Sequence, residues 1–256
     1  MCGRYASSRK PEDLVEEFEV DRVDVASPLA ADYNVAPTKD VYAVLDRRGH
    51  DREAPKPQRR LRVVKWGLVP SWAKDPEIGS RLINARVETL ADKPAYKKAF
   101  AKRRCLLPAD GYYEWDVTEQ LGTNGKPVKQ PFFIRPTDGG PLAMAGLYEI
   151  WRNQALPQDH DDAFLWTATV ITTTAEDVVG RIHDRMPMLV EPDQYDAWLD
   201  VESTNAEDLT ALLVPAAAGR LAAYPVSTAV NNVSNNGPEL LDRVSHEDEP
   251  DALFSP

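Results

Sequence analysis

The sequence predicts a single α+β domain that is rich in β-strands. Most of its regularly spaced segments alternate apolar and polar residues, as strands do, and only a few short ones repeat apolar residues at helical spacing. No stretch shows the change in composition that marks a linker, and no internal repeat is present. The 256 residues, 43% of them hydrophobic, suffice for one sizeable core. We expect the domain to cover residues 2–236 and an acidic, partly disordered tail to cover residues 237–256.

The first third of the chain is expected to contain one helix and several strands. Pro11–Val20 has Pro in its first turn, acidic residues beside it, and Leu14 and Phe18 on one face, which is typical of an amphipathic helix. Asp32–Thr38 contains Asn and Pro and is expected to be a loop, and the polar segment His50–Gln58 an exposed hairpin tip. Strands are expected at residues 2–6, Val41–Leu45 and Leu61–Trp66.

The rest of the chain alternates strands with short helices. Strands are expected at Arg104–Pro108, Gly111–Asp116, Pro131–Arg135, Leu142–Trp151, Phe164–Thr172 and Ala222–Val226. Helices are expected at Ala95–Lys102, Thr174–Gly180, Tyr195–Leu199 and Ala206–Val214. Thr118–Gln130 is rich in Gly and Lys and is expected to be a hairpin tip, Arg152–Asp162 is an acidic loop with an exposed His160, and His246–Pro256 is expected to be disordered.

Composition argues against several classes of protein. There is no run of about 18 apolar residues that would indicate a membrane span, and the amino terminus lacks the pattern of a signal peptide. The two cysteines do not make a disulfide framework, and the four histidines and two cysteines lack metal-ligand spacing. We therefore expect a monomer in the reducing cytoplasm, with no metal and no cofactor.

The distribution of charge favours a phosphate-containing partner, although the net charge is −11. Residues 56–104 contain 14 Lys and Arg against 4 Asp and Glu, a balance of +10, while the rest of the chain carries −21. A basic segment within an acidic protein is a better sign of phosphate binding than the overall charge. A solvated charged surface is the alternative that charge alone leaves open.

Cys2 is the residue with the most distinctive chemistry. It follows the initiator Met1, and an aminopeptidase removes Met when the next side chain is small, so we expect the mature chain to begin at Cys2. A terminal Cys carries an amine and a thiol on adjacent carbons, whose ordinary pKa values are about 8 and 8.5. This pair condenses with an aldehyde to an imine and then closes a five-membered thiazolidine ring. A chance Met-Cys start is the alternative.

A loop with two tryptophans follows the strand that ends at Trp66. The segment Trp66–Lys74 contains Trp66 and Trp72, two helix breakers and a Lys, and bases stack on such aromatic platforms beside cations. A buried Trp pair that closes a core explains the segment equally well. Farther along, Asn84 and Arg86 stand two apart, so on a strand their side chains lie on the same side.

Three more residues are candidates for chemistry. Glu114 lies among aromatic residues, which raise the pKa of a carboxyl unless a cation or hydrogen-bond donors compensate. His183, between acidic and basic neighbours before a strand, is positioned like a catalytic His, although a structural role is as compatible with a lone His. Cys105 is interpreted as a small buried hydrophobic residue.

Eight short stretches carry a family resemblance when they are taken together. They follow one another from residue 2 to about residue 236 and are Met1–Tyr5, Tyr33–Thr38, Trp66–Trp72, Asn84–Thr89, Arg104–Pro108, Gly111–Trp115, Ala145–Glu149 and His183–Pro187. The set resembles the SOS-response-associated peptidase (SRAP) family, whose members crosslink to abasic sites in single-stranded DNA. The chain departs from the family in an expanded loop near residues 152–162 and in its acidic tail, and neither touches a matched motif.

The resemblance implies a fold, a site and a partner. The fold is a curved, barrel-like β-core with peripheral helices and a DNA groove on one face, and the partner is single-stranded DNA with an abasic site, bound in the cytoplasm and on the nucleoid. The implied catalytic residues are Cys2, Asn84, Glu114 and His183. The implied DNA-binding residues are Arg4, Asn34, Pro37, Trp66, Pro70, Trp72, Arg81, Arg86, Trp115 and Thr172.

These residues predict an abasic-site crosslinking enzyme that shields the lesion in the DNA damage response. Its family name also implies a peptidase, which would act on the Met1–Cys2 bond of its own chain, with lyase-type chemistry at the sugar. Two alternatives remain open. An amidohydrolase with an N-terminal Cys nucleophile also begins Met-Cys-Gly, and a non-catalytic module that binds single-stranded DNA would make Cys2 incidental.

Overall fold

The computed structural model describes residues 2–48, 56–121 and 125–244, and its core is a closed β-barrel. Five strands pair in the order β11–β10–β7–β4–β5, and a parallel pairing between β5 and β11 closes the ring, while the other neighbours are antiparallel. The expected curved, barrel-like β-core is therefore confirmed. The barrel strands are β4 (Asp40–Arg47), β5 (Gln58–Trp66), β7 (Arg104–Ala109), β10 (Leu142–Arg152) and β11 (Phe164–Thr174).

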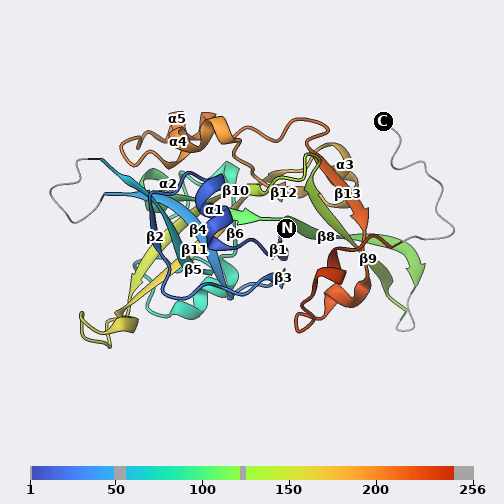
Figure 1. Ribbon diagram of the computed structural model, residues 1–256, viewed down its shortest axis with the longest axis horizontal. Coiled ribbons are helices and arrows are strands. Elements are labelled where there is room, and N and C mark those ends of the chain that lie inside the picture. Colours follow the sequence, from blue (N-terminus) through green and yellow to red (C-terminus); the bar gives the residue numbers. More distant parts are fainter. Residues whose placement is uncertain (1, 49–55, 122–124, 245–256) are drawn as a thin grey trace.

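Three short strands extend the barrel sheet, and a second sheet lies beside it (Figure 1). The short strands are β2 (Arg22–Asp24) along β5, and β6 (Asn84–Arg86) and β12 (Arg185–Pro187) along β11. The second sheet has the order β13–β9–β8–β1–β3, made of Leu221–Pro225, Pro127–Pro136, Gly111–Leu121, Tyr5–Ser7 and Asp32–Val35. In Figure 1, β1 lies at the centre of the view, between the barrel and the β8–β9 hairpin.

The helices are short, and α1, α2, α4 and α5 pack on one side of the barrel sheet while α3 packs against β8 and β13. They are α1 (Pro11–Glu17), α2 (Lys97–Lys102), α3 (Asp177–Ile182), α4 (Tyr195–Leu199) and α5 (Ala206–Ala211), with six 3-10 turns, η1 (Pro76–Arg81), η2 (Val87–Thr89), η3 (Asp161–Ala163), η4 (Pro192–Gln194), η5 (Thr228–Asn231) and η6 (Pro238–Leu241). α1 begins with Pro11, as expected, but ends at Glu17 rather than Val20 because Glu19 takes a φ of 51°. Leu14 and Phe18 are buried, and burial of such side chains stabilises the fold by about 1.5–3 kcal/mol each.

Alternation along the barrel strands separates two large hydrophobic clusters. In β4, Val41 and Ala43 belong to a cluster shared with the second sheet, whereas Tyr42 and Val44 belong to one shared with α1, α2 and α4. Successive strand side chains point to opposite faces, so one strand supplies both clusters. The first cluster reaches the amino-terminal arm and includes Cys2.

Two glycines permit close approaches that position the site. A Cβ on Gly111, at the start of β8, would lie 2.4 Å from Phe133 Cζ and 2.5 Å from the Ile134 carbonyl oxygen of β9. Gly67 has a φ of +124°, and a Cβ there would lie 2.6 Å from the Gly79 carbonyl oxygen. Only glycine meets both demands, since a side chain would clash with the neighbouring strand or turn.

Several expected boundaries differ from those observed. Asp32–Thr38 is not a loop throughout, because Asp32–Val35 pairs with β1 as β3. The connection between the two hairpin strands is shorter than the expected tip Thr118–Gln130, because β8 continues to Leu121 and β9 begins at Pro127. Asn and Lys lower the tendency to form a strand only slightly, so hydrogen bonding to a neighbouring strand outweighs their effect.

The carboxyl-terminal part of the described chain packs onto the second sheet. η6 buries Leu240, and Arg243 forms an isolated bridge with Val226, so the fold continues beyond the expected boundary at residue 236. The expected disordered segment His246–Pro256 and most of the expected tip His50–Gln58 lie outside the described residues. His160 is exposed in its loop, as expected.

Candidate active site

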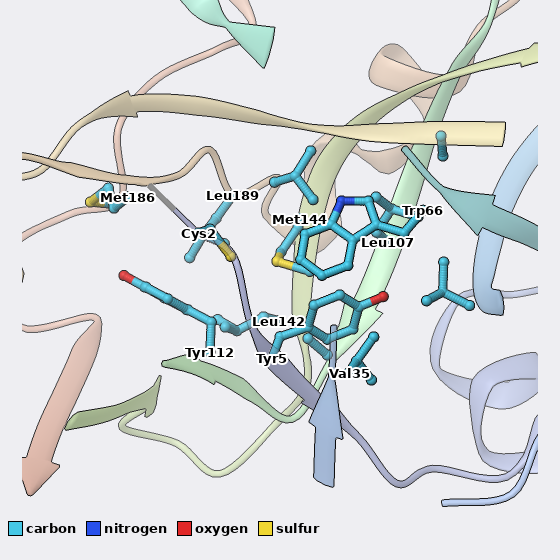
Figure 2. Close-up of a cluster of buried hydrophobic side chains, with 14 of the residues drawn as sticks. Cys2, Tyr5, Val35, Trp66, Leu107, Tyr112, Leu142, Met144, Met186 and Leu189 are labelled. Atoms are coloured by element: carbon cyan, nitrogen blue, oxygen red, sulfur yellow. The ribbon is translucent and has the colours of Figure 1, made fainter. Parts of the chain in front are cut away.

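Cys2 lies on the amino-terminal arm, alongside β8. Tyr5 pairs with Tyr112, and the N–H of Tyr113 donates to the Arg4 carbonyl at 2.9 Å, so the arm lies antiparallel to β8. The side chain of Cys2 is fully buried. Figure 2 shows it within the cluster that contains Tyr112, Met144 and Leu189. Sheet pairing therefore holds the arm as far as Arg4, two residues from Cys2.

The surroundings of Cys2 keep its thiol protonated in the free protein. Burial raises the pKa of the Cys2 thiol strongly, the charge of Glu114 raises it further, and a hydrogen bond from the Arg4 backbone N–H opposes this in part. Cys105 is buried in β7, and burial alone raises the pKa of its thiol. The expectation that Cys105 is a buried hydrophobic residue is confirmed. Cys2 differs from it by its position beside a carboxylate.

Asn84 is brought to the amino-terminal arm by a parallel strand. β6 pairs with β11 in register Asn84–Val170, and the Tyr96 hydroxyl donates to the Asn84 carbonyl at 3.1 Å. The Asn84 Nδ2 donates to the Cys2 carbonyl at 2.8 Å. Among the described residues, its Oδ1 is buried without a hydrogen-bond partner. Buried amide oxygens are rarely left unsatisfied, so Oδ1 is an acceptor available to a bound molecule.

Glu114 lies in β8, two residues after Tyr112 on the same face of the strand. Only 3% of it is exposed, and burial raises the pKa of its carboxyl, while nearby positive charge, including that of His183, lowers it in part. The expectation from the aromatic surroundings is confirmed. A carboxyl whose pKa is raised exchanges a proton nearer neutral pH than an ordinary one does.

His183 follows α3 directly and is partly exposed, with 28% of its side chain accessible. The Arg185 N–H donates to its Nδ1 at 2.9 Å, and Asp184 Oδ1 lies 3.0 Å from the same nitrogen. The two contacts require different protonation states of the ring. Nδ1 accepts from the Arg185 N–H only when it carries no proton, and it donates to Asp184 only when it carries one. In the neutral ring that accepts from Arg185, the proton lies on Nε2.

A cavity of about 440 Å³ joins Glu114 and His183 and is open to solvent. The remaining lining residues are Arg4, Trp115, Lys129 and Asn231. Lys129 falls within the expected hairpin tip Thr118–Gln130, and Asn231 lies in the Asn-rich loop Val230–Asn236. The β8–β9 register, which brings Lys129 opposite Val117, is what carries it to the cavity, and no local sequence signal specifies that register.

Arg4 and Asn34 form a latch within the fold. Arg4 Nη1 donates to Asn34 Oδ1 at 2.6 Å and to the Val230 carbonyl at 2.9 Å. Asn34 is fully buried, and its Nδ2 donates to the carbonyls of Val230, Asn232 and Asn235. The Asn34 amide thus fixes the Asn-rich loop Val230–Asn236, and the DNA contact of Asn34 stays a prediction. Arg4 still lines the cavity.

The two tryptophans of the Trp66–Trp72 segment have opposite surroundings. Trp66 is fully buried, its Nε1 donates to the Ile83 carbonyl at 3.0 Å, and its ring packs against Tyr5. Trp72 is 56% exposed. Trp66 is therefore part of the core, and its covered ring offers no face on which a base could stack. Trp72 keeps an exposed ring that a base could stack on. Pro70 is also buried, and Pro37 is partly buried.

The other expected DNA-binding residues divide by exposure. Arg81 and Arg86 are exposed, at the end of η1 and on β6. Trp115 is partly exposed, and its Nε1 donates to Asn231 Oδ1 at 2.6 Å. Thr172 is 1% exposed and lies opposite Arg86 and Pro187 in the sheet, and its DNA contact stays a prediction.

Comparison with known proteins decides the family. Residues 1–233 match the family described as SOS response associated peptidase (SRAP). The chain belongs to the SRAP family. It is 35% identical to the abasic site processing protein YoaM of Bacillus subtilis over 96% of this chain and 100% of that protein. It is 34% identical to the abasic site processing protein YedK of Escherichia coli, over 95% and 100% of the two chains.

More distant relatives of this SRAP chain share its architecture. The abasic site processing protein HMCES of Xenopus tropicalis is 28% identical over 94% of this chain and 78% of that protein. A crystal structure of a protein from Bacteroides thetaiotaomicron superposes with a TM-score of 0.77 at 23% identity, over 95% of this chain and 100% of that one. A phage-related protein from Bordetella bronchiseptica gives a TM-score of 0.62 at 27% identity, over 88% and 94%.

Part of the positive charge of the basic segment is engaged within the fold of this SRAP chain. Arg104 is 3% exposed, and its guanidinium donates to five backbone carbonyls; burial lowers its pKa to about 10. Four more arginines form ion pairs: Arg59 with Asp46 and Asp196, Arg60 and Arg62 with Asp24, and Arg103 with Glu149. Much of the expected positive charge therefore stabilises the fold, and the exposed remainder includes Arg81, Arg86, Lys97 and Lys98.

Within the described ranges, the search for metal ligands and membrane spans found neither. No group of three or more His, Cys, Asp and Glu side chains there could hold a metal ion. No described helix is both long enough and apolar enough to cross a membrane.

Proposed function

We propose that this protein recognises abasic sites in single-stranded DNA and forms a covalent thiazolidine crosslink with them through Cys2, after removal of Met1. The observation that carries the proposal is that Glu114 and His183 line one open cavity while Glu114 also acts on the buried Cys2, whose carbonyl Asn84 holds, in a chain whose relatives are named abasic site processing proteins. The crosslink would shield the lesion in the DNA damage response, in the cytoplasm and on the nucleoid.

The first step joins the amine of Cys2 to the sugar. An abasic site is in equilibrium with a ring-opened aldehyde, whose C1′ is the electrophile. The amine nitrogen bonds to C1′, and loss of one water molecule leaves an imine. Removal of Met1 is required because an amine held in a peptide bond is acylated and cannot form an imine.

The second step closes the ring with the thiol. The Cys2 sulfur bonds to the imine carbon, the C=N double bond becomes single, and the proton of the thiol is transferred to the nitrogen. No oxidant or leaving group is needed. Because burial and Glu114 raise the pKa of the thiol, this proton stays on sulfur until the imine offers a base. The site thereby favours amine attack first.

Each remaining residue has a separate role in proton transfer or positioning. Glu114 takes a proton from the α-ammonium, a role that its raised pKa suits. His183, as the imidazolium with its Nδ1–H toward Asp184, donates a proton from Nε2 to the sugar oxygen as the ring opens and is left neutral. Asn84 fixes the Cys2 carbonyl through Nδ2 and offers Oδ1 to the sugar without adding charge.

Arg4 at the cavity would hold the strand together with the exposed Arg86 and Trp72. Arg4 and Arg86 would contact phosphates, which position a strand without reading its sequence. Trp72 offers an exposed ring for an unstacked base, and base stacking is worth about 1–3 kcal/mol per base. Unstacked bases are available in single strands, so we propose a monomer that prefers single-stranded DNA over continuous duplex.

A denaturing gel with abasic single-stranded DNA tests the proposal. Crosslinking yields a shifted band that is lost in Cys2→Ala, whereas a shift confined to native gels would indicate a non-catalytic DNA-binding module. Release of ammonia from glutamine would instead support the amidohydrolase. Intact mass of the active protein should begin at residue 2, and full crosslinking by chains that retain Met1 would contradict the mechanism.

The family description also supports a second candidate activity, a self-processing peptidase. In this reaction the Cys2 thiol would attack the Met1 carbonyl, and hydrolysis of the resulting thioester would release Met1 and leave the free amine. Expression in cells that lack methionine aminopeptidase activity tests it. Met1 should still be lost, and this loss should stop in Cys2→Ala.

A further inference from the structure

Lys129 lies on the outer part of the β8–β9 hairpin, at the mouth of the cavity. In the ladder it faces Val117, while Trp115 faces Pro131. Opposed residues and residues two apart lie on one face of an antiparallel pair, so Lys129 and Trp115 share a face. Both line the cavity that contains Glu114 and His183.

The two cations of the cavity differ in what they already bind. Arg4 donates to Asn34 Oδ1 and to the Val230 carbonyl, so an incoming anion competes with two internal acceptors. Lys129 is exposed, and its side-chain ammonium makes no hydrogen bond or ion pair within the described part of the chain. An anion that reaches the cavity therefore meets Lys129 without displacing a protein contact.

The wall beside Lys129 is held in place before any ligand arrives. Trp115 Nε1 donates to Asn231 Oδ1 at 2.6 Å, and Asn231 ends η5. The carbonyls on either side of it, Val230 and Asn232, accept from the buried Asn34 amide. The Trp115 ring is thus fixed next to the Lys129 ammonium, so little conformational entropy is lost at Trp115 when a group binds between them.

We propose that Lys129 is a phosphate-binding residue that holds a phosphate adjacent to the abasic sugar while the sugar enters the cavity. This assignment rests on the proposed function. A phosphodiester fits the chemistry because it is anionic, is covalently attached to the reacting sugar, and binds well to a lysine ammonium as a point charge. Lys129 makes no contact with Cys2 in this scheme and acts by positioning the substrate.

Binding is measured first with an oligonucleotide that carries a tetrahydrofuran analogue, which cannot form an imine. Lys129→Gln should weaken binding by roughly tenfold, since hydrogen bonds to charged groups are worth about 1.5–3 kcal/mol. The slope of log affinity against log salt should fall in magnitude by about 0.7. Lys102→Gln, an exposed lysine of α2 outside the cavity, should change affinity by less than about twofold.

Neutral methylphosphonates then identify the phosphate. One oligonucleotide replaces the phosphate on the 5′ side of the analogue, and another replaces the one on the 3′ side. If Lys129 binds one of them, that replacement weakens binding to the wild-type chain but leaves Lys129→Gln nearly unchanged. Additive losses at both positions, or equal losses in Lys129→Gln and Lys102→Gln, would overturn the proposal.

The crosslinking assay separates this proposal from the proposed function. On reactive abasic DNA, Lys129→Gln should raise the half-saturating DNA concentration roughly tenfold and keep the maximal rate within about twofold. A wild-type chain that never crosslinks would refute the proposed function, while the analogue-binding result would still decide the role of Lys129. A maximal rate that falls more than tenfold would refute positioning by Lys129.

Discussion

The latch formed by Arg4 and Asn34 gives the sharpest stability prediction. Asn34→Ala removes the acceptor of the Arg4 guanidinium and the donor to the carbonyls of Val230, Asn232 and Asn235. The Val230 carbonyl keeps its bond from Arg4 and the Asn232 carbonyl keeps its bond from the Asn235 N–H, so the Asn235 carbonyl alone loses its described partner. The backbone of residue 34 retains its contacts with Asp32 and Lys39.

The expected loss follows from these contacts. A hydrogen bond to a charged group contributes about 1.5–3 kcal/mol, and a neutral one about 0.5–1.5 kcal/mol net. Asn34→Ala should therefore lower the free energy of unfolding by roughly 3 kcal/mol, which is roughly 6–12 °C in Tm for a domain of this size. Trp115 should also lose its fixed partner, because Asn231 lies in the loop that the latch holds.

Thermal and urea unfolding measure the first effect, and crosslinking of abasic DNA measures the second. Asn232→Ala is the matched control, because its side chain accepts only from the Ser234 N–H at the surface, and it should cost less than about 0.5 kcal/mol. Asn34→Asp retains an acceptor for Arg4 and should fall between. If Asn34→Ala is as stable as Asn232→Ala, the latch does not hold the loop.

Three further predictions concern matched residues. Cys2→Ala should abolish crosslinking on denaturing gels, whereas Cys105→Ala should retain it with only a loss of stability. Glu114→Gln should slow crosslinking by about 10²–10⁴-fold. Burial holds the folded-state pKa of Glu114 above 4.5, so the protonated carboxyl stabilises the fold relative to the ionised one. That stabilisation is fully present below about pH 4.5 and is lost as pH rises through the folded-state pKa. The Gln variant should therefore unfold at a higher temperature than wild type at about pH 7, with the difference vanishing at about pH 4. Trp66→Ala should cost about 3–5 kcal/mol of stability, while Trp72→Ala should leave Tm within about 2 °C and weaken DNA binding in a titration by about 1–3 kcal/mol.

The residues with distinctive chemistry were predictable because local sequence encodes them. The Met1–Cys2 start, the carboxyl among aromatic residues at Glu114, and the spacing of Asn84 and Arg86 on a strand depend only on nearby residues. Alternation of apolar and polar residues likewise predicted most strands and the position of Cys105. The order of the motifs also sufficed to indicate the SRAP family.

Tertiary structure decided which of two similar residues is buried and which is available. Trp66 and Trp72 lie in one segment, yet only Trp66 is covered, because β5 leads it into the cluster with Tyr5. Lys129 reaches the cavity through the pairing of β8 with β9, and Asn34 is buried by a loop some 200 residues away. These outcomes depend on the register between distant strands, which the residues around each position do not specify.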